Sequence, residues 1–303
     1  MTIRPALSLI LVVVSLALAI QARGSEGVRE INQACVVTGC FSGDGAGFPV
    51  TITAEGSYRL TSSLVASLAR DAIRIEATDV TLDLNGFSIG GSNVGTIGIW
   101  DFGVAGVERA VIRNGSIHNF TSHGISLQGG LNRIEQVQLI SNAGSGVLTG
   151  QGSWVVENLI MSNGSHGVEL VGSLQDQAQG LVSGNIITDN DGDGINTLRG
   201  TRVSGNILLA NDDAIDGSNT LVEHNVILQN FGDAIELPTP GRALVAENVL
   251  YLNSGFGALE LATIPTTGYA RNAINSNVMG TISVTGTPQQ LDANVCNGDL
   301  TCP

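Results

Sequence analysis

Short apolar runs recur along this chain about every twenty residues. The clearest stretch starts at Leu181 and reads LVSGNIITDNDGDGINTL, then RVSGNILLANDDAIDG, then LVEHNVILQNFGDAIEL, ending at Leu237. Within each run apolar residues alternate with polar ones, as expected of a strand with one buried face. A repeat of this length indicates a solenoid, because each coil can bury its apolar face only against its neighbours.

Three columns of residues predict three short strands in each coil. The first strand opens with a small residue followed by an aliphatic one, and no helical period separates it from the next two strands. The pattern therefore predicts an all-β fold, a parallel β-helix of about ten coils. The small residues are Gly98, Gly124, Gly146, Gly167, Gly194, Ala214, Ala234 and Ala258. The second strands carry Val155, Val182, Val203, Val222 and Val245, and the third strands carry Ile160, Ile187, Leu208, Ile227, Leu250 and Ile274.

Asparagines fill two further columns, one before and one after the third strand. Asparagine tolerates a left-handed corner and can hydrogen-bond along a stack of identical side chains. We therefore expect two structural ladders rather than ligand-binding groups. The first contains Asn158, Asn185, Asn206, Asn225, Asn248 and Asn272, the second contains Asn163, Asn190, Asn211, Asn230, Asn253 and Asn277, and Asn114 and Asn119 repeat the spacing.

With its segments YRLTSSL and VTLDLNGFSIGG and its repeated GN-I-x-x-N and DGI motifs, the chain resembles the right-handed parallel β-helix repeat proteins of the pectate-lyase-like superfamily. The resemblance covers nearly all of the chain after its first residues and implies a right-handed coil. It leaves the activity open, because that superfamily includes lyases, hydrolases, epimerases, phage tailspikes and adhesins.

The N-terminal residues differ from the repeat. Arg4 and the apolar run that follows it predict a signal peptide over 1–22, and hence a secreted or periplasmic protein. We expect an N-terminal cap over 23–49, in which the spacing of Val28, Ile31 and Cys35 predicts a short capping helix.

We expect the β-helix to occupy 50–285 and a C-terminal closure to occupy 286–303. The four cysteines form two close pairs in the two end segments, as expected of disulfides in an oxidising compartment. The predicted bonds join Cys35 to Cys40 and Cys296 to Cys302.

The charge of the chain limits its partners. It carries 27 acidic residues against 13 basic ones, a net charge of −14, and contains no lysine. This composition argues against nucleic acid or an anionic membrane as a partner. We expect a monomer with no membrane span after the signal peptide.

Two columns beside the first strand form an acidic strip. The residue before the small opening residue is His123, Ser145, His166, Asp193, Asp213, Asp233 or Gly257, and the second residue after it is Ser126, Leu148, Glu169, Asn196, Asp216, Glu236 or Glu260. If the aliphatic column points inward, the second of these columns points outward. We expect this strip to bind a polysaccharide or cell-surface glycan, with Glu169, Asn196, Asp216 and Glu236 as binding residues.

Three interpretations of the strip remain open. Its carboxylates can be solvated turn residues of a structural or adhesive coil without catalytic activity. They can also hold calcium, because Asp189, Asp191 and Asp193 precede Gly194 in a D-x-D-x-D-G sequence, the first half of an EF-hand loop. Such a loop lacks its final Glu here, which Asp213 or Asp216 of the next coil would replace.

The third interpretation is catalytic. The segments DGI at Asp193 and DDAI at Asp212 are similar to the N-T-D and G-D-D segments of polygalacturonase-type glycosidases. That resemblance implies that Asp212 or Asp213 protonates the leaving oxygen while Asp193 activates water. Asp233, which stands where that family has His, is the fourth acid/base candidate. A calcium-dependent lyase would need an arginine base, for which Arg199 and Arg202 are the nearest choices.

Overall fold

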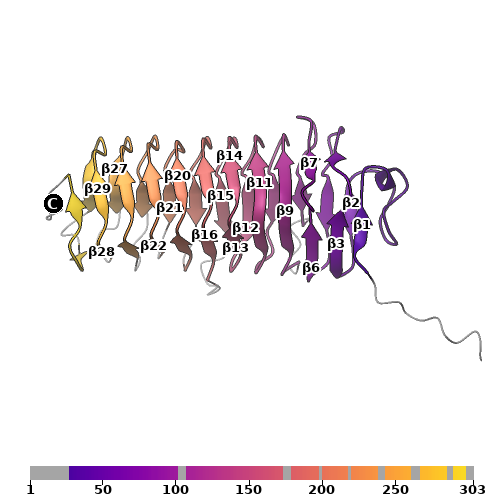
Figure 1. Ribbon diagram of the computed structural model, residues 1–303, viewed down its shortest axis with the longest axis horizontal. Helices are drawn as coiled ribbons and strands as arrows, with labels where there is room; N and C mark the ends of the chain where they lie inside the picture. Colours follow the sequence, from indigo (N-terminus) through magenta and orange to yellow (C-terminus); the bar gives the residue numbers. More distant parts are fainter. Residues whose placement is uncertain are drawn as a thin grey trace, which may run out of the picture.

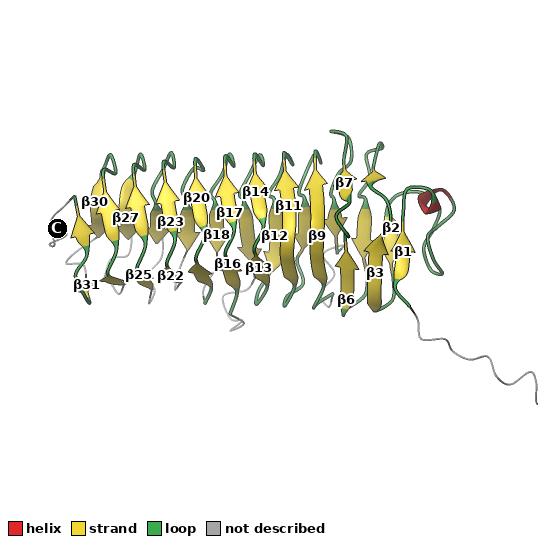
Figure 2. Cartoon of the chain, in the orientation of Figure 1, coloured by secondary structure: helices red, strands yellow, loops and turns green. Residues whose placement is uncertain are grey.

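The computed structural model of this protein describes residues 27–101, 107–172, 179–197, 200–217, 220–237, 243–260, 267–284 and 289–297. Its strands stack side by side along one long axis, from the N-terminal end to the C-terminal end (Figure 1). Figure 2 shows strands and loops with one short helix near the N-terminal end. No described helix has the length and apolar character that a membrane span requires.

The first strands of successive coils form an eleven-stranded parallel sheet. Its strands pair in register, so that Ile195 lies opposite Ile215 and Ile215 opposite Ile235. The strands are β2 (Val50–Ile52), β5 (Ile73–Ile75), β8 (Ile99–Trp100), β10 (Ile125–Leu127), β12 (Val147–Gly150), β15 (Val168–Val171), β18 (Ile195–Thr197), β21 (Ile215–Gly217), β24 (Ile235–Leu237), β27 (Phe256–Glu260) and β30 (Gly280–Val284).

The second and third strands together form a sheet of 21 strands, because β9 (Val111–His118) and β11 (Arg133–Ile140) are long enough to contribute to both stacks. The remaining second strands are β1 (Arg29–Ile31), β3 (Gly56–Leu60), β6 (Val80–Asp83), β13 (Trp154–Val156), β16 (Leu181–Ser183), β19 (Arg202–Ser204), β22 (Leu221–Glu223), β25 (Leu244–Ala246), β28 (Gly268–Ala270) and β31 (Gln289–Gln290). The remaining third strands are β4 (Leu64–Val65), β7 (Ser88–Gly90), β14 (Leu159–Met161), β17 (Ile186–Thr188), β20 (Ile207–Leu209), β23 (Val226–Leu228), β26 (Val249–Tyr251), β29 (Ala273–Asn275) and β32 (Val295–Cys296).

The core is a continuous column of aliphatic side chains from all three stacks. In one coil, for example, Ile195, Val203 and Leu208 are completely buried, and the residues on either side of Val203 and Leu208 are partly or fully exposed. The alternation that predicted the strands therefore reflects which side chains point inward, and the predicted three-strand coil is confirmed.

Small residues open the strands of the eleven-stranded sheet for a steric reason. A Cβ atom on Gly146 would lie 2.6 Å from Cγ2 of Ile160 and 2.8 Å from the carbonyl oxygen of Gly167. These glycines have no positive φ angle. Close packing of the coil against its neighbour, rather than a tight corner, therefore requires the small residue at Gly146.

The two asparagine ladders are present and almost completely buried. Asn185 donates from Nδ2 to Oδ1 of Asn206 at 2.9 Å, and Asn206 donates to Oδ1 of Asn225 at 3.0 Å. Asn142 and Asn294 extend the ladders beyond the predicted members. Each ladder residue except Asn294 follows a left-handed corner residue, such as Asp189 (φ 56°) or His224 (φ 57°). Asn114 and Asn119 instead occupy left-handed corners themselves, with φ values of 62° and 60°.

The predicted capping helix is wrong in position. Residues Arg29–Ile31 form strand β1, which pairs with β3 and belongs to the sheet, while the helix is a single 3-10 turn at Cys35–Val37. The alternating burial of a strand accounts for Ile31, which is fully buried. The disulfide between Cys35 and Cys40 is confirmed. The predicted signal peptide lies outside the described residues.

At the C-terminal end the coils continue further than the sequence indicated. Strands β31 and β32 pair with β28 and β29, and Asn294 adds one more step to an asparagine ladder. Cys296 is buried and disulfide-bonded, whereas Cys302 lies outside the described residues. The predicted C-terminal closure thus begins with another stacked coil.

The register predicted from the sequence is wrong by one residue at β27. The sequence placed Leu259 in the inward column opposite Ile235 and Glu260 in the strip, but Leu259 pairs with Glu236 and Ala258 pairs with the buried Ile282. Phe256 rather than Gly257 follows Asp233 in the column before the strand. Gly257 rather than Ala258 is the small residue that opens this strand, because an added Cβ on Gly257 would lie 2.3 Å from Cγ2 of Ile274 and 2.7 Å from the carbonyl oxygen of Thr281. Glu260 therefore pairs with Leu237 and does not continue the acidic strip.

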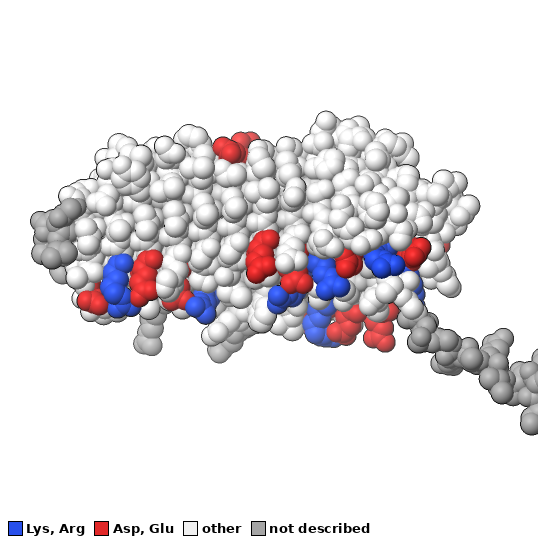
Figure 3. All heavy atoms as spheres, in the orientation of Figure 1, with Lys and Arg blue, Asp and Glu red and all other residues white. Residues whose placement is uncertain are grey.

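Charged side chains on the face formed by the 21-stranded sheet lie mostly in one band. In Figure 3, arginine and acidic side chains alternate along the lower part of this face, where the second strands lie. Ion pairs across neighbouring coils account for this arrangement, including Arg113 with Asp83 at 3.2 Å and Arg271 with Asp292 at 3.0 Å. Each such exposed pair contributes little to stability, about 0–1 kcal/mol.

Candidate acidic site on the eleven-stranded sheet

The acidic strip lies on the outer side of the eleven-stranded sheet. Glu169, Asn196, Asp216 and Glu236 occupy matching outward positions on β15, β18, β21 and β24, each beside a completely buried aliphatic residue. Each of these four side chains is partly exposed. The predicted binding residues are therefore brought together in one row, at roughly the 4.8 Å spacing of neighbouring strands.

The column before these strands has a structural role that the sequence did not reveal. Nδ1 of His123 accepts the backbone N–H of Ser145 at 3.0 Å, and Asp213 accepts the N–H of Asp233 through Oδ1. The backbone N–H of the next residue in the column is accepted in the same way by Asp71, His166, Asp193 and Asp233. Each of these side chains thus satisfies a backbone donor of the following coil, a role open to His and Asp alike.

His166 and Asp193 form an ion pair in the strip. Nδ1 of His166 lies 3.2 Å from Oδ2 of Asp193, and Asn196 donates to the same oxygen at 2.9 Å. The hydrogen bond to Asp193 raises the pKa of His166, against the opposing effect of burial. Burial raises the pKa of Asp193, but hydrogen bonds from His166, Asn196 and the Asp213 backbone outweigh it and hold that pKa below its usual value. Asp193 is therefore ionised at neutral pH.

Asp216 and Glu236 behave in the opposite way. Burial, together with the charges of Asp193 and Asp213, raises the pKa of Asp216 to about 6. Burial also raises the pKa of Glu236 to about 7, with further contributions from its hydrogen bond to Asp213 and from that residue's charge. The cause is a row of carboxyl groups too close together for all of them to ionise.

Asn196 connects the two kinds of carboxyl group. Its Nδ2 atom lies 2.9 Å from Oδ2 of Asp193 and 3.3 Å from Oδ2 of Asp216. These two oxygens therefore lie within about 6 Å of one another. One is ionised and the other holds a proton up to about pH 6, so the strip contains an acid and a base side by side.

A second group of carboxylates lies one coil further along. One oxygen from each of Asp213, Asp233 and Glu236 lies within 4.8 Å of the others, and all three side chains are half-buried. Among the described residues, these three acidic side chains lie close enough to one another to bind one metal ion jointly. Burial raises the pKa of Asp233, and the backbone N–H of Phe256 opposes that effect.

The predicted calcium ligands are divided between two places. Asp189 and Asp191 line a hollow of about 380 Å³ together with Asp212 and Phe231, whereas Asp193 contacts His166 in the strip. Asp189 occupies a left-handed corner next to an asparagine ladder and accepts a hydrogen bond from Thr188. Asp212, a predicted acid, is exposed in this hollow, and its pKa is raised by partial burial and by the charge of Asp213.

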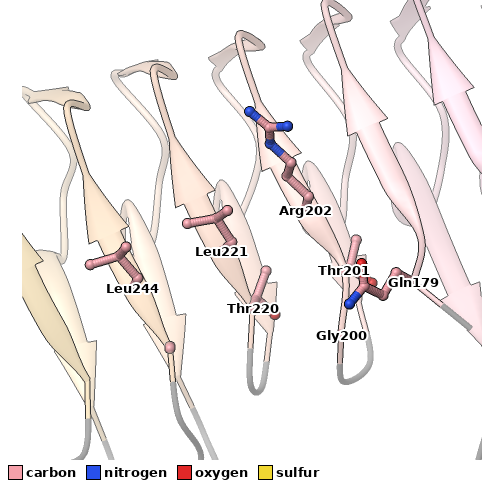
Figure 4. Close-up of a pocket in the computed structure, with 8 residues that line it drawn as sticks. Gln179, Gly200, Thr201, Arg202, Thr220, Leu221 and Leu244 are labelled. Carbon is pink, nitrogen blue, oxygen red and sulfur yellow. The ribbon is translucent and has the colours of Figure 1, made fainter. Parts of the chain in front are cut away.

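Arg202, the candidate lyase base, lies away from the strip. It lines a hollow of about 600 Å³ with Thr201, Leu221 and Leu244, on successive second strands of the other sheet (Figure 4). Its guanidinium pairs with Glu223, with 2.7 Å between Nε and Oε1. Arg199 lies outside the described residues. None of the described acidic strip residues lines this hollow.

Sequence reasoning missed the pairing of His166 with Asp193. The signal was present, because the two residues occupy the same column in consecutive coils and so must lie one strand spacing apart. It also missed the hydrogen bond from Ser145 Oγ to Glu169 at 3.0 Å, which fixes one end of the strip. Ser145 itself is completely buried.

We compared the chain with known protein sequences and solved structures. No curated protein sequence matches the chain. The A-module of the Azotobacter vinelandii mannuronan C-5 epimerase AlgE6 is similar in structure, with a TM-score of 0.58 and 14% identity over 88% of this chain and 84% of that one. The corresponding AlgE4 module gives 0.58 and 13%, over 86% and 87%. The catalytic domain of a GH87 alpha-1,3-glucanase gives 0.55 and 12%, over 88% and 63%.

The sequence also matches a family directly. Residues 50–208, just over half of the chain, match the family described as the right handed beta helix region. This match includes β2 to β20 and fixes the hand of the coil that the strand pattern left open. The chain therefore belongs to the right-handed β-helix family.

Proposed function

We propose that this protein binds a polysaccharide along the acidic strip and hydrolyses it there. The observation that carries the proposal is the contact of Asn196 with both Asp193 and Asp216, two neighbouring carboxyl groups whose pKa values are shifted in opposite directions. Glycosidases need such a pair, one group ionised and the other protonated. The similar solved structures, two epimerase modules and a glucanase domain, act on polysaccharides and support a glycan as the ligand.

In the proposed reaction Asp216 donates its proton to the glycosidic oxygen as the bond to that oxygen breaks. Asp193, held by His166 and Asn196, attacks the anomeric carbon and forms a glycosyl ester as the leaving sugar departs; Asp216, now ionised, then takes a proton from a water molecule that hydrolyses this ester and regenerates Asp193. The limit of about 6 Å between their oxygens favours the short carboxyl spacing of retaining enzymes, about 5–5.5 Å, over the 6.5–9.5 Å of inverting ones. This pair differs from the one expected by resemblance, in which Asp212 or Asp213 was the acid.

The substrate we propose is a neutral glycan. The strip contains no described lysine or arginine side chain to receive a uronate carboxylate, and the charge of the chain would repel an acidic polymer. We further propose that the protein acts outside the cytoplasm, which the disulfide between Cys35 and Cys40 supports.

The test is a panel of neutral and acidic polysaccharides assayed for new reducing ends and for the ultraviolet absorbance of an unsaturated product. Hydrolysis predicts reducing ends without absorbance, loss of at least about a hundredfold in rate for Asp216→Asn and for Asp193→Asn, and no effect of the exposed Asp292→Asn. Proton NMR of the first product would give its anomeric configuration. If the wild type is inert on the whole panel, yet is retarded in gels containing one of the glycans, the strip binds without cutting and the protein is a structural or adhesive coil.

We also propose that calcium binds to Asp213, Asp233 and Glu236 rather than to the sequence motif at Asp189. Carboxylate oxygens suit this ion, and three ligands within 4.8 Å of one another leave its remaining positions for water or sugar hydroxyls. Millimolar calcium should then raise the melting temperature of the wild type but not that of Glu236→Gln, and a chelator should reverse the effect. An equal shift in Glu236→Gln and in an Asp189→Asn, Asp191→Asn double variant, or no shift in the wild type, would exclude this site.

A further inference from the structure

Two parallel rows of side chains point outward from the second strands between β13 and β25. The residue between the two rows, such as Val203, is completely buried and points inward. The first row, which we call the tryptophan row, consists of Trp154, Leu181, Arg202, Leu221 and Leu244. The second, which we call the serine row, consists of Ser183, Ser204 and Glu223 on the three middle strands. A mostly apolar row and a polar row therefore run side by side along the long axis, roughly 7 Å apart.

Trp154 is held in place but largely open to solvent. It is 44% exposed, and Cζ of Arg133 on the preceding coil stands over its ring, 5.3 Å from the ring centre. The guanidinium covers one face of the indole, so the exposed surface belongs to the other face and the ring edge. A large aromatic ring gains from burial, and exposed tryptophans with a fixed orientation are characteristic of binding surfaces. Trp154 therefore forms a flat platform at one end of the tryptophan row.

Two coils beyond Trp154, the tryptophan row borders the hollow of about 600 Å³ shown in Figure 4. Arg202, Leu221 and Leu244 lie on successive strands along this hollow, and the almost completely buried Thr201 and Thr220 are also part of its lining. Hollows of roughly 300–1,000 Å³ that combine apolar side chains with a few polar groups commonly bind small ligands. From Trp154 to Leu244 the row spans four strand steps, roughly 19 Å.

The charges that belong to the two rows cancel. Nε of Arg202 donates to Oε1 of Glu223 at 2.7 Å, and Arg133 pairs with Glu135 at the other end of the surface. The surface is therefore locally neutral, although the chain as a whole carries a charge of −14. Each pair still presents hydrogen-bond donors and acceptors next to one another, as Ser183 and Ser204 do with hydroxyl groups 3.2 Å apart.

We propose that the tryptophan row is a second binding site for a neutral polysaccharide. A sugar ring has an apolar face of C–H groups, which packs on a flat ring or an aliphatic side chain, and a rim of hydroxyl groups, which needs donors and acceptors beside it. The tryptophan row provides the first surface and the serine row provides the second. The strand spacing of roughly 4.8 Å is close to the length of one sugar unit in a polymer, so successive coils meet successive units. An acidic polymer would have to displace the carboxylates that already occupy the arginines.

The nature of the ligand rests on the proposed function, but the site itself does not use the acidic strip. The strip lies on the eleven-stranded sheet, and none of its described residues lines the hollow. A polymer held at the tryptophan row therefore remains available to the strip, at a raised local concentration. The row should strengthen binding of polymers and have no effect on short oligosaccharides that reach only the strip.

Affinity electrophoresis of the full chain tests the proposal, in native gels that contain soluble β-1,3-glucan, dextran, xylan or galactomannan, with polygalacturonate as the acidic comparison. At least one neutral glycan should retard the wild type, and Trp154→Ala should raise the Kd for it about tenfold. Trp154→Phe keeps a flat ring and should lose less. Tyr251→Ala removes an aromatic side chain of similar exposure, 41%, from the third strand β26 and should have no effect.

Tryptophan fluorescence reports on the row directly, because the chain contains only two tryptophans. In Trp100→Phe the remaining indole is Trp154, and its emission should move to shorter wavelength when the glycan is added. The shift should persist when Asp216→Asn is added to this variant, since the proposed acid lies on the other sheet. Circular dichroism checks that each variant folds, and Leu221→Asp provides a second change in the row that should also weaken binding.

Several results would overturn the proposal. They are no retardation of the wild type by any neutral glycan, equal retardation of the wild type and a folded Trp154→Ala variant, and tighter binding of polygalacturonate than of every neutral glycan. If Asp216→Asn abolishes retardation and Trp154→Ala does not change it, all binding occurs at the strip, and the proposed hydrolysis stands without this second site. Retardation that depends on Trp154, without release of reducing ends from any glycan, would support the second site and refute the hydrolysis.

Discussion

Nδ1 of His166 lies 3.2 Å from Oδ2 of Asp193 and 3.1 Å from the backbone nitrogen of the same residue. This ring nitrogen can donate a hydrogen bond to the carboxylate when it is protonated, or accept a hydrogen bond from the backbone N–H when it is not. It cannot do both at once. Protonated His166 forms the ion pair with Asp193, and neutral His166 caps the next coil as His123 does for Ser145. His166 therefore accepts the backbone hydrogen bond of the next coil at high pH and forms an ion pair with Asp193 at low pH.

This pair makes the titration of His166 dependent on Asp193. Because the folded-state pKa of His166 is raised, its stabilising effect is complete below the unfolded value of 6.5 and is lost as pH rises through the folded value. Asp193→Asn should lower the pKa of His166, measured by NMR of the imidazole protons, because it removes the carboxylate that favours the protonated ring. His123, whose pKa burial lowers, should titrate as in the wild type. An unchanged His166 titration in this variant would contradict the ion pair.

Glu236 should make the protein less stable at high pH. A carboxyl group whose pKa is raised to about 7 on folding binds more protons in the folded state, so stability falls as pH rises from about 4.5 to 7. Glu236→Gln should therefore increase the free energy of unfolding at pH 8 by about 1 kcal/mol, less than the full shift implies because the side chain is partly exposed, and should have little effect at pH 4.

Thermal unfolding at the two pH values measures this difference. Glu55→Gln, the same change at an exposed glutamate near the N-terminal end, provides the control and should have no effect at either pH. A gain of equal size at pH 4 and pH 8 would assign the effect to something other than ionisation.

Two substitutions of Asp213 should separate its structural role from its charge. Asp213→Asn keeps an oxygen to accept the N–H of Asp233 and removes the charge that raises the pKa of Glu236, so the variant should be at least as stable as the wild type at pH 8. Asp213→Ala leaves that N–H without its acceptor and should cost about 1–2 kcal/mol in urea denaturation. Equal losses in both variants would show that the acceptor is not what the coil requires.

The asparagine ladders should tolerate substitution poorly. Asn206 accepts two hydrogen bonds from Asn185 and donates to Val182 O and to Asn225, all in the buried interior. Asn206→Ala leaves several of these groups unpaired and should cost roughly 3 kcal/mol or more in urea denaturation. Ser183→Ala, which removes one contact with Ser204 on the surface, is the control and should cost less than about 1 kcal/mol.

Most of the fold could be predicted from the sequence because its contacts repeat. A residue pairs with the one at the same position in the next coil, so periodic aliphatics and asparagines reveal strands, register and ladders without knowledge of any distant contact. The prediction was wrong by one residue at Ala258, because two small residues, Gly257 and Ala258, stand side by side there and the pattern alone does not show which of them opens the strand. It was also wrong at Arg29–Ile31, where a strand too short to show a period was taken for a helix.

The chemistry of the strip was harder to predict. The sequence placed Asp193, Asp213 and Glu236 on one surface, but it could not show which carboxyl groups ionise. That depends on side-chain direction: Asp193 receives hydrogen bonds from His166 and Asn196, whereas Glu236 shares a proton with Asp213. The backbone determines which column a residue occupies. Side-chain rotamers and burial determine which of the carboxyl groups in that column are ionised.

The asparagine ladders have a consequence for how this molecule can vary. Asn206 receives from Asn185 the same contacts that it passes to Asn225, so a whole coil inserted or removed at this point restores equivalent contacts on both sides. The ladder contacts among the described residues therefore do not fix the number of coils. The length of the strip, and with it the number of sugar units that one molecule would cover in the proposed function, can change in steps of a single coil.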